Sequence, residues 1–250
     1  MKIDNLDRFY IATICSQWES VAKEYGIGLE LDHYCQAENM DGDLGHKNEA
    51  VIDELLKEYD AGILHAPFNE LFPAAIDYKA RELAMDRLNQ AANKAIELGI
   101  KKMVVHSGYI PFVYFPQWHV SRSIEFWTEF LSDKPEDFHI SIENVLDDTP
   151  QMLVDIVKGI KGNAGICLDV GHAQVASNIP VEDWIETTLP HLSHVHLHNN
   201  DGTMDYHQPI DEGVIDIDIV VKRVIGESQA SITLETIEIG NSIEYLCQLL

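Results

Sequence analysis

Three histidines alternate with aliphatic residues in the segment HLSHVHLHNND, which spans residues 191–201. At the two-residue period of a β-strand, His194, His196 and His198 point to one face, and the valine and leucine between them point to the other. A single histidine in such a strand is more often a hydrogen-bonded structural residue than a ligand. Neutral imidazole is nevertheless the commonest metal ligand in proteins, and it titrates near neutral pH. The segment therefore indicates either a structural strand or a metal or acid–base site.

Other residues of the same chemical kind end short apolar runs elsewhere in the chain. One such ending means little, because polar residues commonly cap strands. Six strand candidates, however, carry a His, Asp or Glu at or near the carboxyl end: His65, His106, Glu143, Asp169, His196 and Glu235. Three more such residues follow in loops, namely His172, Asp205 and His207. Oxygen and nitrogen ligands without thiolate suit Zn²⁺, Mn²⁺, Co²⁺ or Mg²⁺. We therefore expect a divalent metal site, whose main ligands are Glu143, Asp169, His196 and Glu235.

The elements that must position these residues alternate between strands and helices. Short apolar, β-rich runs predict strands at 9–15, 27–31, 61–65, 102–106, 138–143, 164–169, 194–198 and 231–235. Helical patterns predict helices at 16–25, 47–59, 74–98, 117–132, 149–160, 181–188, 216–225 and 241–249. Such alternation indicates an α/β fold with parallel pairing, and eight units in 250 residues have the size of a (β/α)8 TIM barrel. A doubly wound open sheet is the alternative. In a barrel, the candidate ligands would gather where active sites lie, at the carboxyl ends of the strands.

The sequence predicts a single domain over residues 1–250. No Pro/Ser-rich linker or internal repeat divides the chain, and its 46% hydrophobic content is enough for one large core. The amino terminus lacks the pattern of a signal peptide, and no run approaches 18 apolar residues. We therefore expect a cytoplasmic protein without a membrane partner. Its four cysteines form no CxxC pair, which predicts reduced thiols.

The charge balance argues against nucleic acid as a partner. The chain has 17 Lys and Arg against 42 Asp and Glu, which gives a net charge of −25 with histidine neutral. Such a field repels phosphate backbones, since non-specific DNA affinity comes mostly from Lys and Arg that release counterions. The loops after the first two predicted strands, SQWES and DHYCQAENMDGDLG, contain neither Lys nor Arg. Bound divalent cations would reverse the field only locally.

Seven segments together resemble one known superfamily. LHAPF, VVHSG, SIENV, CLDVGHA, HLHNND, DYHQPIDEG and TLET lie between about residues 61 and 236. Their order and spacing are similar to those of the xylose isomerase-like superfamily. That superfamily joins sugar isomerases and epimerases with endonuclease IV-type apurinic-site endonucleases, known as AP endonuclease family 2. The resemblance implies a TIM barrel that binds one to three metal ions.

The resemblance also implies metal ligands residue by residue. In both branches the main catalytic metal is held by Glu143, Asp169, His196 and Glu235. In the endonuclease branch, a further metal is held by His65, His106 and Glu143, and a third by His172, Asp205 and His207. This sequence has a suitable residue at all nine positions.

Four functions remain open at this point, of which three are enzymatic. The preferred one is a metal-dependent isomerase or epimerase of a small sugar, cyclitol or sugar phosphate, which works through an enediolate. By resemblance, Glu143 and Glu235 would be the catalytic proton donor and acceptor, and His172 would assist. The alternative is a di- or trinuclear zinc phosphodiesterase of the apurinic-site type. A barrel that binds a sugar or metal without turnover is a third reading, and dehydratase or lyase chemistry a fourth.

The remaining expectations concern substrate, cofactor and assembly. The predicted substrate contacts are His198, Phe68, Asn69 and Trp118, the last by stacking on a sugar ring. The cofactor is expected to be Zn²⁺ or Mn²⁺, with Co²⁺ and Mg²⁺ as alternatives. The expected partner is a small sugar-like substrate, nucleic acid is disfavoured, and the chain is compatible with a homo-oligomer.

Overall fold

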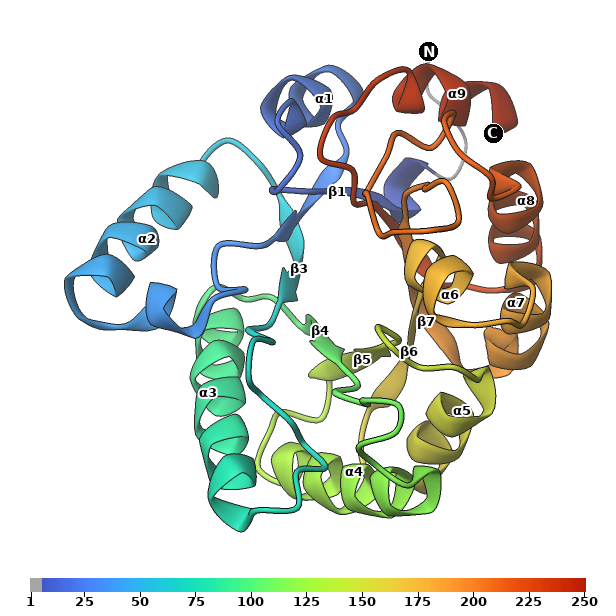
Figure 1. Cartoon of the computed structure of the whole chain (residues 1–250). Helices are drawn as coiled ribbons and strands as arrows, with labels where there is room; N and C mark the ends of the chain where they lie inside the picture. The colour runs from blue at the N-terminus through green and yellow to red at the C-terminus, as the bar shows by residue number, and fades with distance from the viewer. Residues whose placement is uncertain (1–5) are drawn as a thin grey trace.

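The computed structural model describes residues 6–250, and within them eight strands close into a barrel (Figure 1). The strands are β1 (Phe9–Ala12), β2 (Gly28–Leu31), β3 (Ala61–His65), β4 (Lys102–His106), β5 (His139–Glu143), β6 (Ala164–Asp169), β7 (Leu192–Leu197) and β8 (Ser231–Leu234). Each strand pairs in parallel with the next, and β8 pairs in parallel with β1. The predicted (β/α)8 barrel is confirmed, and the open sheet was the wrong alternative.

Helices follow the strands and surround the barrel (Figure 1). They are α1 (Trp18–Tyr25), α2 (Gly42–Leu55), α3 (Tyr78–Glu97), α4 (Pro116–Leu131), α5 (Pro150–Gly159), α6 (Val170–Ala176), α7 (Val181–Thr188), α8 (Ile217–Glu227) and α9 (Ser242–Leu249). Three short 3₁₀ helices accompany them at Leu6–Arg8, Ala37–Met40 and Leu189–His191. Within residues 6–250, no helix is long and apolar enough to cross a membrane.

The element boundaries differ from the predicted ones where side chains or turns end the pattern. The strand predicted at 9–15 stops at Ala12, because the Cys15 N–H donates to the Ala12 carbonyl in a turn. The helix predicted at 74–98 starts only at Tyr78, since Asp77 caps it. The short helix α6 was not predicted. It follows β6 without a loop, and it starts there because Asp169 is both the last strand residue and the helix cap.

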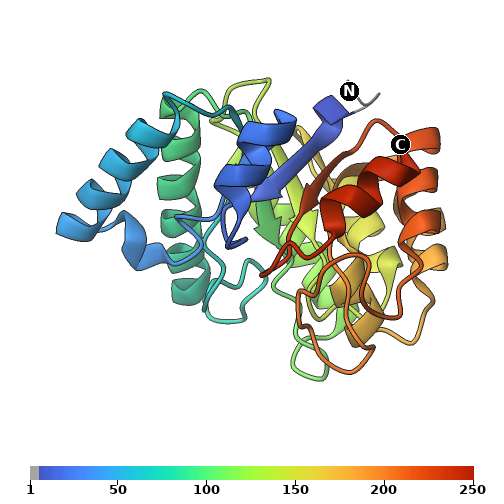
Figure 2. The same cartoon turned by 90° about the horizontal axis from the view of Figure 1, so that it is seen from above.

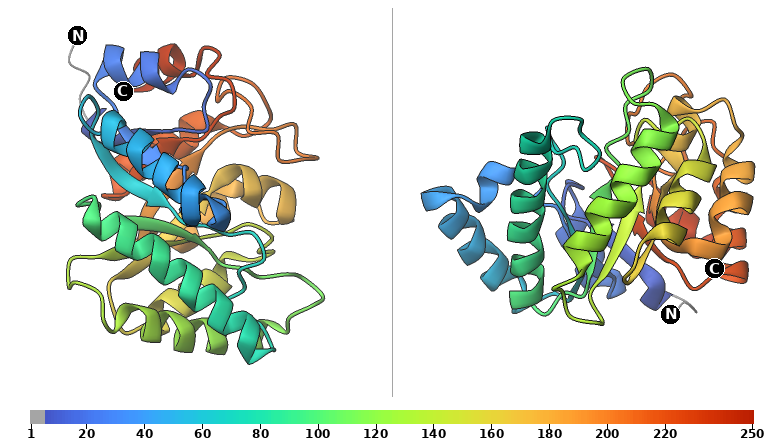
Figure 3. Two further views of the ribbon diagram at one scale, coloured as in Figure 1. Left: turned by 90° about the vertical axis from the view of Figure 1, so that its left-hand side faces the viewer. Right: turned by 90° about the horizontal axis from the view of Figure 1, so that it is seen from below.

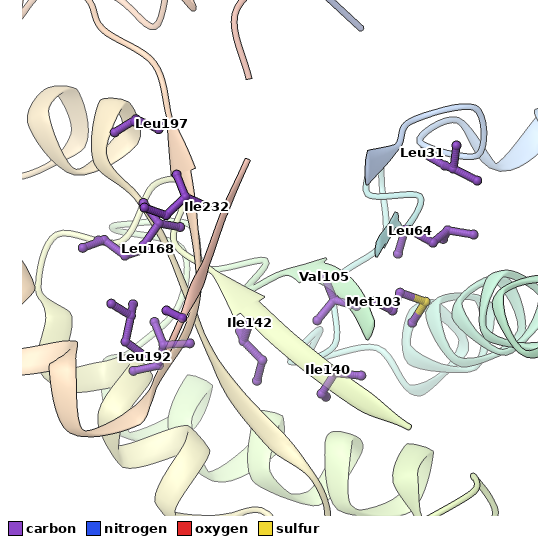
Figure 4. Packing of buried hydrophobic residues seen from close by; sticks show 14 of the residues in the cluster. Leu31, Leu64, Met103, Val105, Ile140, Ile142, Leu168, Leu192, Leu197 and Ile232 are labelled. Carbon is purple, nitrogen blue, oxygen red and sulfur yellow. The ribbon is translucent and has the colours of Figure 1, made fainter. Parts of the chain in front are cut away.

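The outer faces of the strands form the main core. Their apolar side chains alternate with inward-facing residues and pack against the helices, as the two-residue strand period requires. Figure 4 shows some of these side chains close up, with Leu64, Met103 and Ile232 among those labelled. In β7 the outward residues are Val195 and Leu197, which confirms the alternation expected for that strand.

The interior of the barrel holds a smaller apolar layer below the polar site. Ile63, Val104 and Cys167 form a separate buried cluster, and Tyr10 packs against it. Glycine is required beside this tyrosine, because a Cβ at Gly62 would lie 2.6 Å from the Tyr10 ring. This apolar layer lies beneath the charged groups at the carboxyl ends of the strands.

The longest loops gather at that same end of the barrel. In Figures 2 and 3 the loop after β4 and the loop after β7 extend from one end of the molecule. Helix α2 lies outside α3, away from the barrel (Figures 1 and 2). It is tied there by ion pairs from Arg87 to Asp41, the residue just before α2, and from Lys94 to Glu49.

One buried histidine in α4 gives a prediction for stability against pH. His119 lies between Tyr109 and Tyr114, and neither of its ring nitrogens finds a hydrogen-bond partner within residues 6–250. Burial lowers the pKa of His119 from 6.5 to about 4, so the folded chain keeps it neutral where the unfolded chain takes up a proton. Its contribution to stability is therefore complete above pH 6.5 and is lost as the pH falls towards about 4.

The His119→Phe variant should lack this dependence. Between pH 6.5 and 4, the free energy of unfolding of the parent protein should fall by about 3 kcal/mol more than that of the variant. Urea unfolding at a series of pH values measures the difference. Parallel curves for the two proteins would contradict the assignment.

Candidate active site

A cavity of about 650 Å³ opens at the carboxyl ends of the strands. Seven of the nine predicted metal ligands line it, and the other two, Asp169 and His196, are fully buried directly beneath. Asp32, His33 and Cys35, from the segment after β2, also line it. The barrel thus brings together all nine residues, which are spread over 171 positions between 65 and 235 in the chain.

His196 lies at the centre of the carboxylates. Its Nδ1 is 2.9 Å from Oε2 of Glu235, 3.3 Å from Oε1 of Glu143 and 3.8 Å from Oδ2 of Asp169. Its Nε2 lies 3.0 Å from Oε1 of Glu30, and donation of the Nε2 proton to that carboxylate leaves a lone pair on Nδ1 whenever the ring is neutral, as it is in a metal complex. Nδ1 of His196 and Oε2 of Glu235 are both buried without a hydrogen-bond partner in the described part of the chain.

A second group consists of His65, His106 and Glu143. Nδ1 of His65 donates to the carbonyl of Ala66 at 2.9 Å, so its Nε2 lone pair faces Oε2 of Glu143 at 3.2 Å. Nε2 of His106 lies 3.4 Å from the same oxygen. The His106 ring stacks on Phe68, with 4.2 Å between centroids, which fixes its direction. One carboxylate oxygen is thus shared by two imidazoles.

A third group joins loop residues from two places in the chain. Nε2 of His172 lies 3.1 Å and Nε2 of His207 3.0 Å from the same oxygen, Oδ2 of Asp205. The Nδ1 atoms of these rings donate to the carbonyls of Asn144 and Glu235. His207 has a φ of 48°, in the left-handed region that a non-glycine residue adopts only when its surroundings hold it there.

Four of these histidines share one arrangement that suits a metal ion. They are His65, His172, His196 and His207. In each ring, one nitrogen donates to a carbonyl or carboxylate, and the other faces a carboxylate oxygen 2.9 to 3.2 Å away. Two electron-rich atoms attract each other only when a proton or a metal cation lies between them. Hydrogen bonds that fix the tautomer of a ligand histidine are also the usual companions of protein metal sites. The donor set therefore fits divalent cations with mixed nitrogen and oxygen ligands.

The electrostatics of the site are dominated by burial and by the many carboxylates. Burial by itself would raise the pKa of Glu143, but the charge of His196 and hydrogen bonds from His172 and His196 outweigh it and hold that pKa well below its usual range. Burial lowers the pKa of His106 to about 3. Burial and the charge of Glu30 raise the pKa of Asp32, which also lines the cavity, to about 7.

Glu30 is an important site residue that the sequence reading missed. It stands inside the barrel on β2, fully buried, and bridges two histidines of β7, because its Oε2 accepts from Nε2 of His194 at 3.0 Å. Thr233 donates to the same oxygen. The signal was a lone acid in the apolar strand IGLEL, at an inward position of the two-residue period. A buried carboxylate needs such partners.

The other two histidines of β7 and its end, His194 and His198, are both buried but have different partners. His194 is fully buried and binds Ser231 and Glu30, as expected for a residue inside the barrel. His198 is also fully buried, with Nε2 3.1 Å from both Asp169 oxygens, and does not line the cavity. It therefore lies against a predicted ligand, behind the cavity lining.

The predicted substrate contacts Phe68 and Asn69 line the cavity, and Trp118 does not. Trp118 lies in α4, where its Nε1 donates to the carbonyl of Ala74 and Arg122 packs over its ring. The indole is held by these contacts outside the cavity lining, so the position of Trp118 gives no support to stacking on a sugar.

Comparisons with known proteins agree with this geometry. A family model described as xylose isomerase-like TIM barrel matches residues 21–248. The chain is 36% identical over 235 residues to the uncharacterised protein MJ1311 of Methanocaldococcus jannaschii. The aligned region covers 86% of this chain and 76% of that protein. Among solved structures, a D-tagatose 3-epimerase-like protein superposes with a TM-score of 0.74 and 28% identity over 96% of both chains. The TTHB071 protein from Thermus thermophilus, soaked with ZnCl₂, superposes with a TM-score of 0.77 and 24% identity over 97% of both chains.

Proposed function

Because the chain belongs to the xylose isomerase-like TIM barrel family, we propose that it is a divalent-metal-dependent isomerase or epimerase of a small sugar, sugar phosphate or cyclitol. The observation that carries the proposal is the buried Nδ1 of His196, which has three carboxylates within 3.8 Å and no hydrogen-bond partner among the described residues. The 28% identity to a D-tagatose 3-epimerase-like protein supports the same reaction class.

The residues that would hold the principal ion are Glu143, Asp169, His196 and Glu235. When bound, a divalent cation supplies Lewis-acid polarisation of a sugar carbonyl and its neighbouring hydroxyl. The same cavity offers Phe68 and Asn69 as contacts for the rest of the sugar. Zn²⁺ and Mn²⁺ are the first ions to test, and Co²⁺ and Mg²⁺ the next.

Glu143 and Glu235 are the proposed proton carriers. They reach the cavity from β5 and from the end of β8, and each has an oxygen within 3.3 Å of the same nitrogen of His196. A carbon acid bound between them can lose its proton to one carboxylate and receive a proton from the other on the opposite face, which inverts that centre. His172, 3.3 Å from Oε1 of Glu143, can hold or pass a proton there.

A second candidate function rests on the other two ligand groups. His65, His106 and Glu143, and separately His172, Asp205 and His207, are each close enough to share one ion. Three metal ions would suit a zinc phosphodiesterase of the apurinic-site type. Against this candidate, among the residues that the structure describes, no Lys or Arg lines the cavity.

Metal content and solvent exchange together test the proposal. The purified protein is loaded with Mn²⁺, Co²⁺ or Zn²⁺, its metal is counted per chain, and ketoses and inosose-type cyclitols are incubated with it in D₂O. We expect NMR spectra of the sugar to show that deuterium is incorporated at the carbon next to the carbonyl. Near three zinc ions per chain with cleavage of an abasic-site oligonucleotide, and no exchange into any sugar, would contradict the proposal.

Two neighbouring histidines of β7 provide a matched pair of variants. His196→Asn should remove most metal binding and activity, because it deletes the central nitrogen. His194→Asn changes the next inward residue of the same strand, whose ring nitrogens face Ser231 and Glu30 rather than the carboxylates of the predicted ligand set. It should therefore have a far smaller effect, and equal large losses would show that the wrong ring was chosen.

A further inference from the structure

We propose that the substrate of this cavity is an uncharged, hydroxyl-rich molecule, and that phosphorylated sugars and sugar acids are poor substrates. This inference rests on the proposed function and narrows its substrate class. It comes from the Asp, Glu, Lys and Arg side chains of the cavity lining, which are all acidic. Asp32, Glu143, Asp205 and Glu235 line it, and no Lys or Arg does so within the described part of the chain.

Bound metal ions do not give this site an excess of positive charge. Two further carboxylates, Glu30 and Asp169, lie buried directly behind the lining and contact His196 and His198. Four lining carboxylates and two behind them carry between five and six negative charges near neutral pH, because the pKa of Asp32 is about 7. Metal-bound histidines are neutral, so one or two divalent cations would leave the site negative and three would come close to balancing the carboxylates. An anionic substrate therefore gains no net attraction at a loading of one or two ions.

The basic residues of the neighbouring helices are held elsewhere. Arg81, near the start of α3, donates to the carbonyls of Ala75 and Ile76. Arg122, in α4, packs over Trp118 and pairs with Glu125. Neither side chain lines the cavity, so neither supplies the cation that usually recognises a phosphate in a protein.

Helix amino termini are the other common sites for a phosphate, and two of those at this end of the barrel, at α6 and α8, are capped by carboxylates. At α6 the Asp169 side chain accepts from the N–H of His172 at 2.6 Å, and at α8 the Asp216 side chain accepts from the N–H of Ile219 at 3.1 Å. A carboxylate at this position takes the place that a phosphate would occupy, and its charge repels one.

The rest of the cavity lining instead offers partners for hydroxyl groups. Asp32 is held towards the cavity by Thr13 and by the N–H of Ile14, and a carboxylate accepts hydrogen bonds from hydroxyls. The amides of Asn39 and Asn69 also reach the lining. Phe68, stacked on His106, adds an apolar face of the kind that packs on sugar C–H groups.

Matched pairs of free and phosphorylated ketoses test this inference. D-tagatose, D-fructose and D-ribulose are compared with their terminal phosphate esters by kcat/KM and by binding calorimetry on the metal-loaded protein. We expect the free sugar to be preferred by about 100-fold or more, since like charges at close range are strongly disfavoured. Higher salt should narrow the ratio through screening.

Two charge variants show where any selectivity arises. Asp32→Asn removes one lining charge and should narrow the preference for free sugars about tenfold. Glu238→Gln removes an exposed charge that binds Ser16 and Gln17 outside the cavity, and it should leave the preference unchanged. Equal shifts in both variants would assign the selectivity to overall charge and overturn the inference.

The test separates this inference from the proposed function. Equal or tighter binding of the phosphate esters overturns the inference even if they are epimerised, and the proposed function then stands. Selective binding of free sugars without turnover or deuterium exchange supports the substrate class and contradicts the proposed reaction.

Discussion

The Glu235→Gln variant is expected to lose epimerase activity by about 1,000-fold or more while the barrel stays folded. Glu235 has two proposed roles, as a ligand beside His196 and as a proton carrier on one face of the substrate. Its Oε2 is buried and lies 2.9 Å from Nδ1 of His196. Glutamine keeps the size of the side chain, but it neither carries the negative charge nor takes up a proton.

The measurement is the initial rate of epimerisation at saturating metal, with the melting temperature as a check on the fold. Glu238→Gln is the matched control, because it makes the same change three residues later on an exposed side chain. Full activity in the Glu235 variant would refute the proposed site. If the Glu235 variant loses both its activity and its fold, as judged by circular dichroism, the test is repeated with Glu143→Gln, which changes the other proposed proton carrier.

Glu30→Gln is expected to weaken metal binding by about 10- to 100-fold, although Glu30 is not a proposed ligand. Its carboxylate receives the Nε2–H of His196 at 3.0 Å and so holds the opposite nitrogen, Nδ1, towards the carboxylates. It also makes the ring more basic. The glutamine side chain preserves the shape of the contact and removes the charge.

Zn²⁺ affinity, measured by competition with a chromophoric chelator, is the primary readout. The ¹⁵N shifts of the His196 ring report its tautomer and give a second, independent readout. Ser231→Ala is the control, because it deletes a hydrogen bond to His194 in the same network and leaves the contact with His196 intact. Unchanged affinity in the Glu30 variant would refute its positioning role.

The fold could be predicted because its signals are local and repeated. Each strand carries a two-residue alternation or an apolar run, and each following helix has its own amphipathic pattern, so eight units reinforce one another. The boundaries were less certain for an equally local reason. Asp77 and Asp169 set helix starts through single side-chain caps, and those caps compete with the hydrophobic pattern in deciding where an element begins.

The candidate ligands could be proposed from the sequence because a parallel barrel sends all strand ends to one rim. Residues such as His65 and Glu143 are 78 positions apart, yet strand order alone predicts that they meet. The positions of Glu30, Asp32 and Trp118 relative to the site could not be predicted in this way. Nothing in the sequence fixes which way a loop turns, or which inward side chain reaches across the barrel to which partner.

The sequence by itself determined the architecture and the chemical kind of site: a (β/α)8 barrel with histidines and carboxylates at the carboxyl ends of its strands. The tertiary structure decided which nitrogen of each ring is free, which carboxylate it faces, and that the cavity lining holds no cation among the described residues. The reason is physical. Periodicity and residue type act along the chain, whereas tautomers, burial and the balance of charge depend on atoms that only closure of the barrel brings within about 3 Å.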